Sequence, residues 1–83
     1  MRYVVFAKEA CPYCVSAREL LESRKEEHKI INFSPEQEEV LNEIKNACDW
    51  KTVPMIFCRE GDNIQFIGGY TDLVKCMDHV EEG

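Results

Sequence analysis

The chain has 83 residues, enough for one domain with a modest core but too few for a catalytic cleft between two domains. Hydrophobic residues make up 45% and charged residues 31%, which is typical of a soluble globular domain and excludes disordered, collagen-like and membrane-spanning classes. The net charge of −6 opposes general binding to nucleic acid or to anionic membranes, so we expect neither as a partner.

A strand, a helix and a second strand are predicted for the first half of the chain. The β-branched and aromatic run at residues 3–7 predicts a buried strand. This run is too short for a signal peptide or a membrane span, so we expect a cytoplasmic protein. Small and apolar residues then recur at helical spacing from residue 12 to about residue 27, and Pro12 suits the first turn. Residues 28–33 predict the second strand.

A second helix is predicted to begin after Ser34 and to run to about Cys48. Ser34 offers an N-cap, Pro35 suits the first helical position and Gln37 completes a capping box. The glutamates of this segment, among them Glu38, indicate a solvated face. Its predicted apolar side comprises Val40, Leu41, Ile44, Ala47 and Cys48.

The last third predicts an antiparallel hairpin and a short C-terminal helix. Two strands, at residues 55–58 and 64–67, flank a turn at residues 59–63. Gly68-Gly69 interrupts the strand pattern, and Thr71-Asp72 opens the helix. The predicted fold is therefore α/β, with a four-stranded mixed sheet, helices on both of its faces and the order β-α-β-α-β-β-α. This arrangement resembles the thioredoxin fold.

The motif Cys11-Pro12-Tyr13-Cys14 lies between the first predicted strand and helix. Cys11 is therefore expected at a helix N-terminus, where free N–H groups and the helix dipole favour a thiolate. Such sites lower a cysteine pKa from about 8.5 to between about 3.5 and 7.5. Cys14, one turn further in, should be more buried and more protonated, so it would resolve a mixed disulfide that Cys11 forms. Lys8 would add positive charge near the thiolate or meet a substrate carboxylate.

Two structural alternatives compete with redox exchange: a zinc half-site and a buried structural pair of cysteines. A structural zinc site normally takes four ligands, often from two close pairs. Cys48, Cys58 and Cys76 lie singly along the chain, so we expect no metal site. We expect these three thiols to be buried as small apolar side chains.

Four features together resemble the glutaredoxin family, in the same order and over nearly the whole chain: Lys8, the CxxC motif, Thr52-Val53-Pro54 and the segment Gly68–Asp72. The resemblance implies a single glutaredoxin domain over residues 1–83 that reduces protein disulfides and glutathione mixed disulfides through its two motif cysteines. Glutathione would be the co-substrate, and no cofactor would be permanently bound. The resemblance also implies a monomer, with ribonucleotide reductase as one candidate protein partner.

The family's pattern further implies how glutathione would be held. Pro54 would follow a cis peptide bond, and the backbone of Val53 would pair with the glutathione cysteine. Thr71 and Asp72 would hold the γ-glutamyl end at a helix N-terminus. The implied glutathione-binding residues are Lys8, Tyr13, Lys51, Thr52, Val53, Pro54, Gly69, Thr71 and Asp72. The chain departs from the pattern at the rim of the implied groove, where Asp49 replaces a common glycine and Trp50 follows it. It also departs where Tyr70 stands in place of cysteine or serine.

Two rival functions remain open at this point. A glutaredoxin-like thioredoxin would be reduced by a flavoenzyme, thioredoxin reductase, instead of by glutathione. An iron-sulfur carrier would share a cluster between two subunits through their first cysteines and bound glutathione. Pro12 and Cys14 resemble the redox members of the family more than its Cys-Gly-Phe-Ser carriers.

Overall fold

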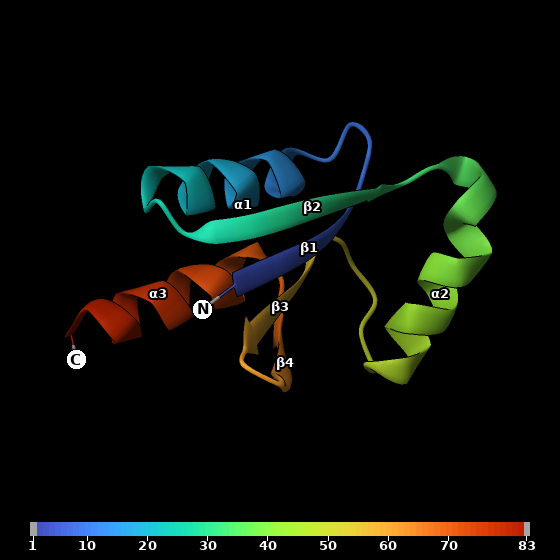
Figure 1. Cartoon of the computed structure of the whole chain (residues 1–83). Helices are drawn as coiled ribbons and strands as arrows, with labels where there is room; N and C mark the ends of the chain where they lie inside the picture. The colour runs from blue at the N-terminus through green and yellow to red at the C-terminus, as the bar shows by residue number, and fades with distance from the viewer. Residues whose placement is uncertain (1, 83) are drawn as a thin grey trace.

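The computed structural model describes the backbone of residues 2–82 and the side chains of residues 2–77 (Figure 1). Its elements in chain order are β1 (Arg2–Lys8), α1 (Pro12–Ser23), β2 (Glu27–Phe33), a 3-10 helix (Pro35–Gln37), α2 (Glu38–Ala47), β3 (Met55–Glu60), β4 (Asn63–Gly68) and α3 (Tyr70–Glu82). The predicted order β-α-β-α-β-β-α is confirmed. Within residues 2–82, every helix is too short or too polar to cross a membrane.

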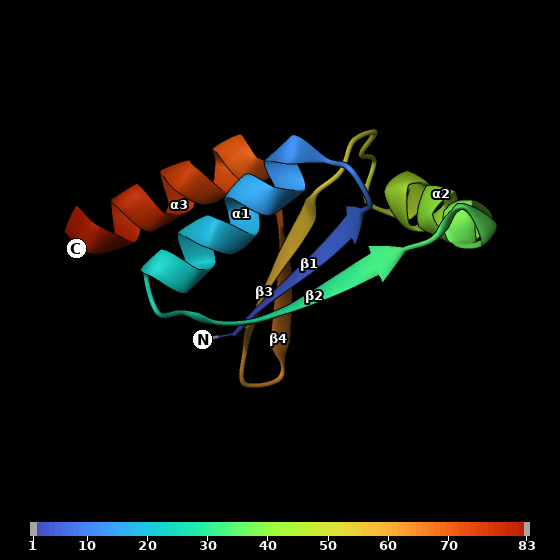
Figure 2. The same cartoon turned by 90° about the horizontal axis from the view of Figure 1, so that it is seen from above.

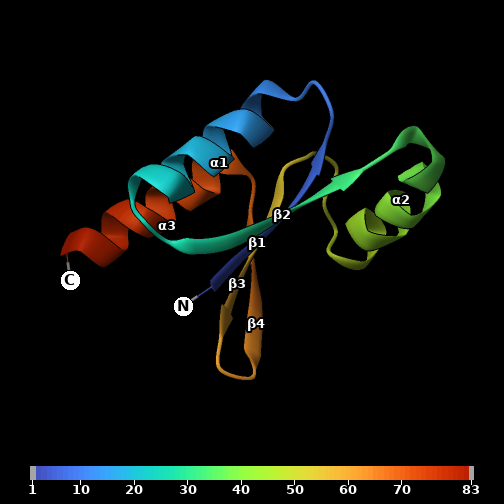
Figure 3. The same cartoon turned by 45° about the horizontal axis from the view of Figure 1, so that its top comes forward.

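The four strands form one mixed sheet in the order β2-β1-β3-β4. β1 pairs parallel with β2 and antiparallel with β3, and β3 pairs antiparallel with β4. The sheet is strongly twisted, so the β3–β4 hairpin runs at a steep angle to β2 in Figure 3. β1 is central, and the CxxC motif follows its carboxyl end.

Side chains alternate across the sheet and build two core clusters. On one face Tyr3, Val5 and Ala7 of β1 are buried against α1 and α3, which lie side by side in Figure 2. On the other face the rings of Phe6 and Phe57 lie 5.2 Å apart, in a second cluster. α2 covers this second cluster from beyond the carboxyl ends of β1 and β2 (Figure 2). The sheet therefore carries helices on both faces, as predicted.

The first helix is shorter than predicted. α1 ends at Ser23, and the predicted last four residues instead form a turn and enter β2. Leu21 is the last fully buried side chain of the helix, and the polar residues that follow have nothing to bury. Lys25 takes a positive φ of 56°, and the N–H of Glu26 donates to the carbonyl of Leu21 at 3.0 Å. The chain therefore reverses four residues before the predicted end.

The second helix differs from the prediction at its start and on its apolar side. It begins as a 3-10 turn, in which the Ser34 N–H donates to Oε1 of Gln37 at 3.1 Å. Leu41 is fully buried, but Val40 is 52% exposed and Ala47 is exposed too. Fewer side chains of α2 are buried than predicted, because the helix contacts only the end of the sheet.

The hairpin turn is tighter than predicted. β3 extends to Glu60 and β4 begins at Asn63, which leaves Gly61 and Asp62 as the turn. Gly61 has φ +63°, a conformation that glycine adopts without strain. α3 begins at Tyr70, one residue before the predicted start.

Candidate active site

Cys11 lies at the N-terminus of α1, as predicted. It is the N-cap residue in an extended conformation, and Pro12 is the first helical residue. The carbonyl of Cys11 accepts the N–H groups of Cys14 at 3.1 Å and of Val15 at 3.2 Å, which closes the first turn. Its half-buried thiol lies 3.8 Å from the carbonyl oxygen of Val53. The sulfur is therefore reachable from outside, close to positive helix N–H groups.

Cys14 lies one turn further in and is only 7% exposed. Burial, together with a hydrogen bond to the side chain of Cys11, raises the pKa of Cys14 to about 12. A backbone hydrogen bond from Lys8 acts in the opposite direction but does not outweigh burial. Cys14 is therefore a thiol at neutral pH, as its predicted position required.

The Thr52-Val53-Pro54 segment lies beside the motif. The Val53–Pro54 peptide bond is cis, as the family resemblance implied. The segment forms one wall of a groove of about 290 Å³. The groove is lined by Tyr13, Trp50, Thr52, Val53, Pro54, Gly69, Tyr70, Thr71 and Asp72. Seven of the nine predicted glutathione-binding residues therefore meet around one groove.

Trp50 and Tyr70 also line this groove, although neither was among the predicted binding residues. The ring of Tyr70 lies 6.3 Å from that of Tyr13, and the indole of Trp50 packs edge-on against Phe66. Trp50 directly precedes Lys51, and Tyr70 directly precedes Thr71. This adjacency to predicted binding residues was a signal that could have placed both rings at the groove.

Asp72 shapes the far end of the groove. Its Oδ2 accepts the backbone N–H of Gly69 at 3.0 Å. Gly68 has φ +128°, and a Cβ at this position would collide with the Asp72 carboxylate. Among the described residues, no donor contacts the second carboxylate oxygen, Oδ1. Asp72 therefore caps the start of α3 through Oδ2 alone.

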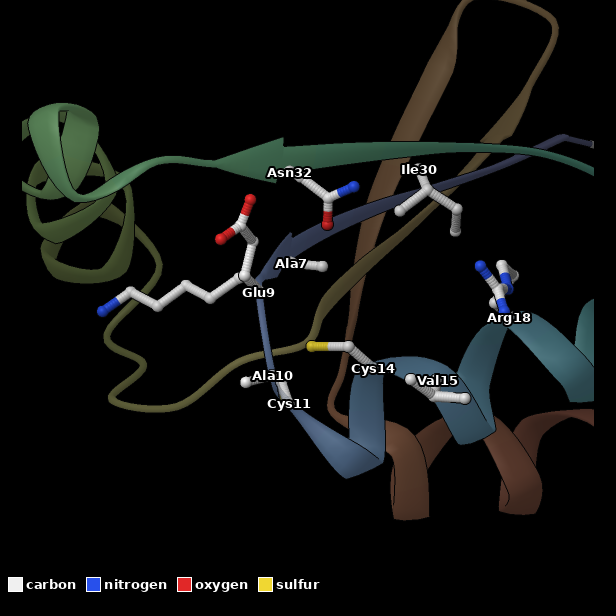
Figure 4. A pocket seen from close by; sticks show the side chains of 10 residues that line it. Ala7, Glu9, Ala10, Cys11, Cys14, Val15, Arg18, Ile30 and Asn32 are labelled. Carbon is white, nitrogen blue, oxygen red and sulfur yellow. The ribbon is translucent and has the colours of Figure 1, made fainter.

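Lys8 and Lys51 lie outside the groove. Lys51 borders a shallow depression with Asp49, Trp50 and Thr52. Lys8 lines a separate cavity of about 240 Å³ next to Cys11 and Cys14. In Figure 4 this cavity lies between α1, which carries Arg18, and β2, which carries Asn32 and Ile30. The Lys8 Nζ lies 2.8 Å from Oε1 of Glu38.

Glu38 is 56% exposed, as the solvated face predicted, and it also forms an ion pair with Lys8. The hydrogen bond from Lys8 and the charge of its ammonium group lower the pKa of the Glu38 carboxyl. No signal in the sequence pointed to this pair, because its members are thirty residues apart.

The three remaining cysteines were predicted to be buried, but the structure leaves them half-buried. They are Cys48, Cys58 and Cys76. Burial raises the pKa of the Cys58 thiol, with a further rise from the neighbouring Cys76. Across the described part of the chain, no group of three or more histidine, cysteine or acidic side chains is placed to hold a metal ion.

Comparisons with known proteins identify the family. Glutaredoxin 1 of Escherichia coli (strain K12) is 35% identical over 79 residues, with 87% of each chain covered. Glutaredoxin 1 of Rickettsia typhi is 36% identical over 73 residues, and the match covers 84% of this chain but 64% of that protein. The chain thus spans just under two thirds of the length of this relative.

Solved structures agree with this match. A dithiolic glutaredoxin of Trypanosoma brucei brucei superposes with a TM-score of 0.74 at 37% identity, covering 93% of this chain and 77% of that one. A buckwheat glutaredoxin, solved as a glutathione complex, superposes with a TM-score of 0.79 at 22% identity and supports the fold alone, with 93% and 68% covered. The family model for glutaredoxin matches residues 3–62, most of the chain. The chain therefore belongs to the glutaredoxin family.

Proposed function

We propose that the chain is a glutathione-dependent dithiol-disulfide oxidoreductase, with Cys11 as nucleophile and Cys14 as resolving thiol. The observation that carries this proposal is the asymmetry of the two thiols. Cys11 is accessible at a helix N-terminus, whereas Cys14 is buried and its pKa is raised to about 12. Only a thiolate attacks a disulfide, so this asymmetry favours first attack by Cys11.

The proposed reaction proceeds by two thiol-disulfide exchanges. The Cys11 thiolate attacks one sulfur of a substrate disulfide, the substrate S–S bond breaks, and the second substrate sulfur leaves and takes up a proton. Cys14 then attacks the Cys11 sulfur and transfers its own proton to the departing substrate thiolate. The substrate disulfide is reduced to two thiols, and the enzyme is oxidised to the Cys11–Cys14 disulfide. Two molecules of glutathione would restore the dithiol and leave as glutathione disulfide.

Once Cys11 is bonded to a substrate sulfur in the mixed disulfide, its free thiol is gone. This change favours the second step, the attack by Cys14. The hydrogen bond and the charge of Cys11 both contribute to the raised pKa of Cys14, and both are changed once Cys11 is bonded to a substrate sulfur. The backbone hydrogen bond from Lys8, which lowers the pKa of Cys14, is independent of that bond. Cys14 would therefore ionise more readily when its attack is needed.

The groove beside the motif supports glutathione as the thiol substrate. The Val53 backbone lies within contact of the Cys11 sulfur, so a bound cysteine would lie alongside it. Oδ1 of Asp72 would accept from the γ-glutamyl ammonium group at the start of α3. The buckwheat relative was solved with glutathione bound.

A coupled assay tests the proposal on the full chain. NADPH oxidation is followed with glutathione, glutathione reductase and a mixed disulfide of glutathione, in the wild type and in Cys11→Ser. We expect turnover in the wild type and none in the variant. Turnover that requires thioredoxin reductase and does not depend on glutathione would overturn the assignment of glutathione as substrate. An active Cys11→Ser variant would overturn the assignment of Cys11 as nucleophile.

A further inference from the structure

The side chains of Lys8 and Glu38 connect the motif to α2. Lys8 is the last residue of β1, three residues before Cys11, and Glu38 is the first residue of α2. Lys8 lines both the cavity next to the two thiols and a smaller cavity of about 140 Å³ that Glu38 also lines. The lysine side chain thus leads from the thiols toward α2, where its ammonium group meets the glutamate at 2.8 Å.

Both basic side chains that line the cavity next to the thiols are held by glutamates. Arg18 Nε lies 3.5 Å from Oε1 of Glu22, one turn along α1. Lys8 is held by Glu38. The motif therefore faces positive charges that are already partly neutralised. Only the lysine is also joined to the thiols through its backbone, by the hydrogen bond to Cys14.

The Lys8–Glu38 pair adds little to folding. Its side chains are 32% and 56% exposed, and exposed ion pairs contribute at most a small fraction of the stability of a domain. Its electrostatic effect on a neighbouring reaction is a separate quantity, because a charge acts over about one Debye length in water. What the pair determines is where the lysine charge lies relative to Cys11.

We propose that Glu38 is a positioning residue for the thiol chemistry: by holding Lys8 it draws positive charge away from Cys11 and limits the attack of Cys11 on anionic disulfides. Anionic substrates with a carboxylate near the reacting sulfur would have to compete with Glu38 for the lysine. Neutral substrates would not depend on this competition. The inference rests on the proposed role of Cys11 but does not require glutathione as the substrate.

Two alkylating reagents of the same shape and different charge test this inference. Iodoacetate is an anion and iodoacetamide is neutral, so the ratio of their rates at Cys11 reports the local potential, with thiolate content cancelling. The rates are measured on the reduced full chain at low ionic strength, and tandem mass spectrometry assigns the alkylated cysteine. Glu38→Gln should raise the ratio about twofold, because the lysine ammonium group is no longer held at α2 and attracts the anionic reagent more strongly.

Two controls make the expected result specific. Glu39→Gln removes the same charge from the next residue of α2, which is exposed, and measures the effect of the lost charge alone, so it should raise the ratio less than Glu38→Gln. In a Lys8→Gln background, Glu38→Gln should have no more effect than Glu39→Gln, because the lysine through which it acts is gone. Circular dichroism verifies that all variants fold.

Three outcomes overturn the inference: an unchanged ratio in Glu38→Gln, an equal rise in Glu39→Gln, or a rise of the same size when Lys8 is absent. Each leaves the proposed function intact as long as Cys11 is the residue that reacts fastest. If another cysteine reacts first in the wild type, the assignment of the nucleophile fails instead.

Discussion

At the scale of single residues, burial separates two chemically identical thiols. Cys11 and Cys14 are three positions apart, yet the first caps a helix and the second packs into the core beside Ala17 and Leu21. Removing water from around Cys14 disfavours its thiolate more than the single backbone hydrogen bond favours it. The proposed order of attack thus rests on the position of each sulfur along one helical turn.

Replacement of the buried thiol should separate two activities. Cys14→Ser should lose reduction of protein disulfides by the dithiol route but keep turnover of glutathione mixed disulfides, because external glutathione replaces the resolving thiol. Both activities are measured in the glutathione-coupled assay with a protein disulfide and a glutathionylated peptide. Equal loss of both would show that Cys14 is structural.

Asp72 should act on recognition and on helix capping in separable ways. Asp72→Ala should raise the KM for a glutathionylated substrate roughly ten- to a hundredfold, since it removes a charge-assisted hydrogen bond of about 1.5–3 kcal/mol. It should also destabilise the start of α3 by about 1 kcal/mol. Asp72→Asn keeps an acceptor for the Gly69 N–H but not the charge, so it should raise KM with little loss of stability. A normal KM in both variants would leave Asp72 as a helix cap only.

At the scale of elements, the junction of β4 and α3 depends on one glycine. Gly68→Ala should lower the free energy of unfolding by about 2–4 kcal/mol, because alanine at φ +128° is strained and its Cβ would displace the Asp72 carboxylate. Gly61→Ala is the matched control: it also has a positive φ, but a Cβ there meets nothing within 4 Å, so we expect about 1 kcal/mol. Urea unfolding midpoints give both values. Equal losses would mean that backbone conformation alone matters at residue 68.

The elements themselves were predictable because local patterns specify them. Alternation in β1, the proline at the start of α1 and the capping glutamine before α2 each determine an element within a few residues. The end of α1 was not predictable from propensity, since it is set by where the helix loses contact with the core after Leu21. Val40 was predicted inside for the same reason: helical period shows which residues share a face but not how much of it the sheet covers.

Some features of the candidate site were likewise predictable from the sequence, and others were not. The groove residues were predictable from a resemblance that spans the chain, because the fold brings the cis-proline loop and the start of α3 to one place. The partner of Lys8 was not, because an ion pair between β1 and α2 depends on where α2 docks at the end of the sheet. Trp50 lines the groove from a loop in which Asp49 has a positive φ of 53°.

At the scale of the whole molecule, the buried ionisable groups predict loss of stability at alkaline pH. Burial raises the pKa of Tyr3 from 10.0 to about 12, and the pKa of Cys14 is raised from 9.0 to about 12. The unfolded chain therefore loses these protons at lower pH than the native state. The stability is complete below about pH 9 and should fall between pH 9 and 12, by up to about 1.4 kcal/mol per pH unit for each group.

Urea titrations under reducing conditions at several pH values measure this fall. Tyr3→Phe should flatten the decline above pH 10, because it removes the buried hydroxyl whose pKa is raised. Stability that stays constant to pH 11 would contradict the buried state of both groups.

The central position of β1 has a consequence for amide hydrogen exchange. β1 has a hydrogen-bonded neighbour on each side, whereas β2 and β4 are edge strands. Amides of β1 should therefore exchange with deuterium only when the whole domain unfolds, while edge strands also exchange through smaller openings. β3 is the second inner strand, so the same holds for its amides. The loop that carries Cys11 follows β1 at Lys8, and the Val53–Pro54 segment directly precedes β3 at Met55. The start of α3 instead follows the edge strand β4. Adjustment of the groove to differently shaped partners would therefore come from its α3 side.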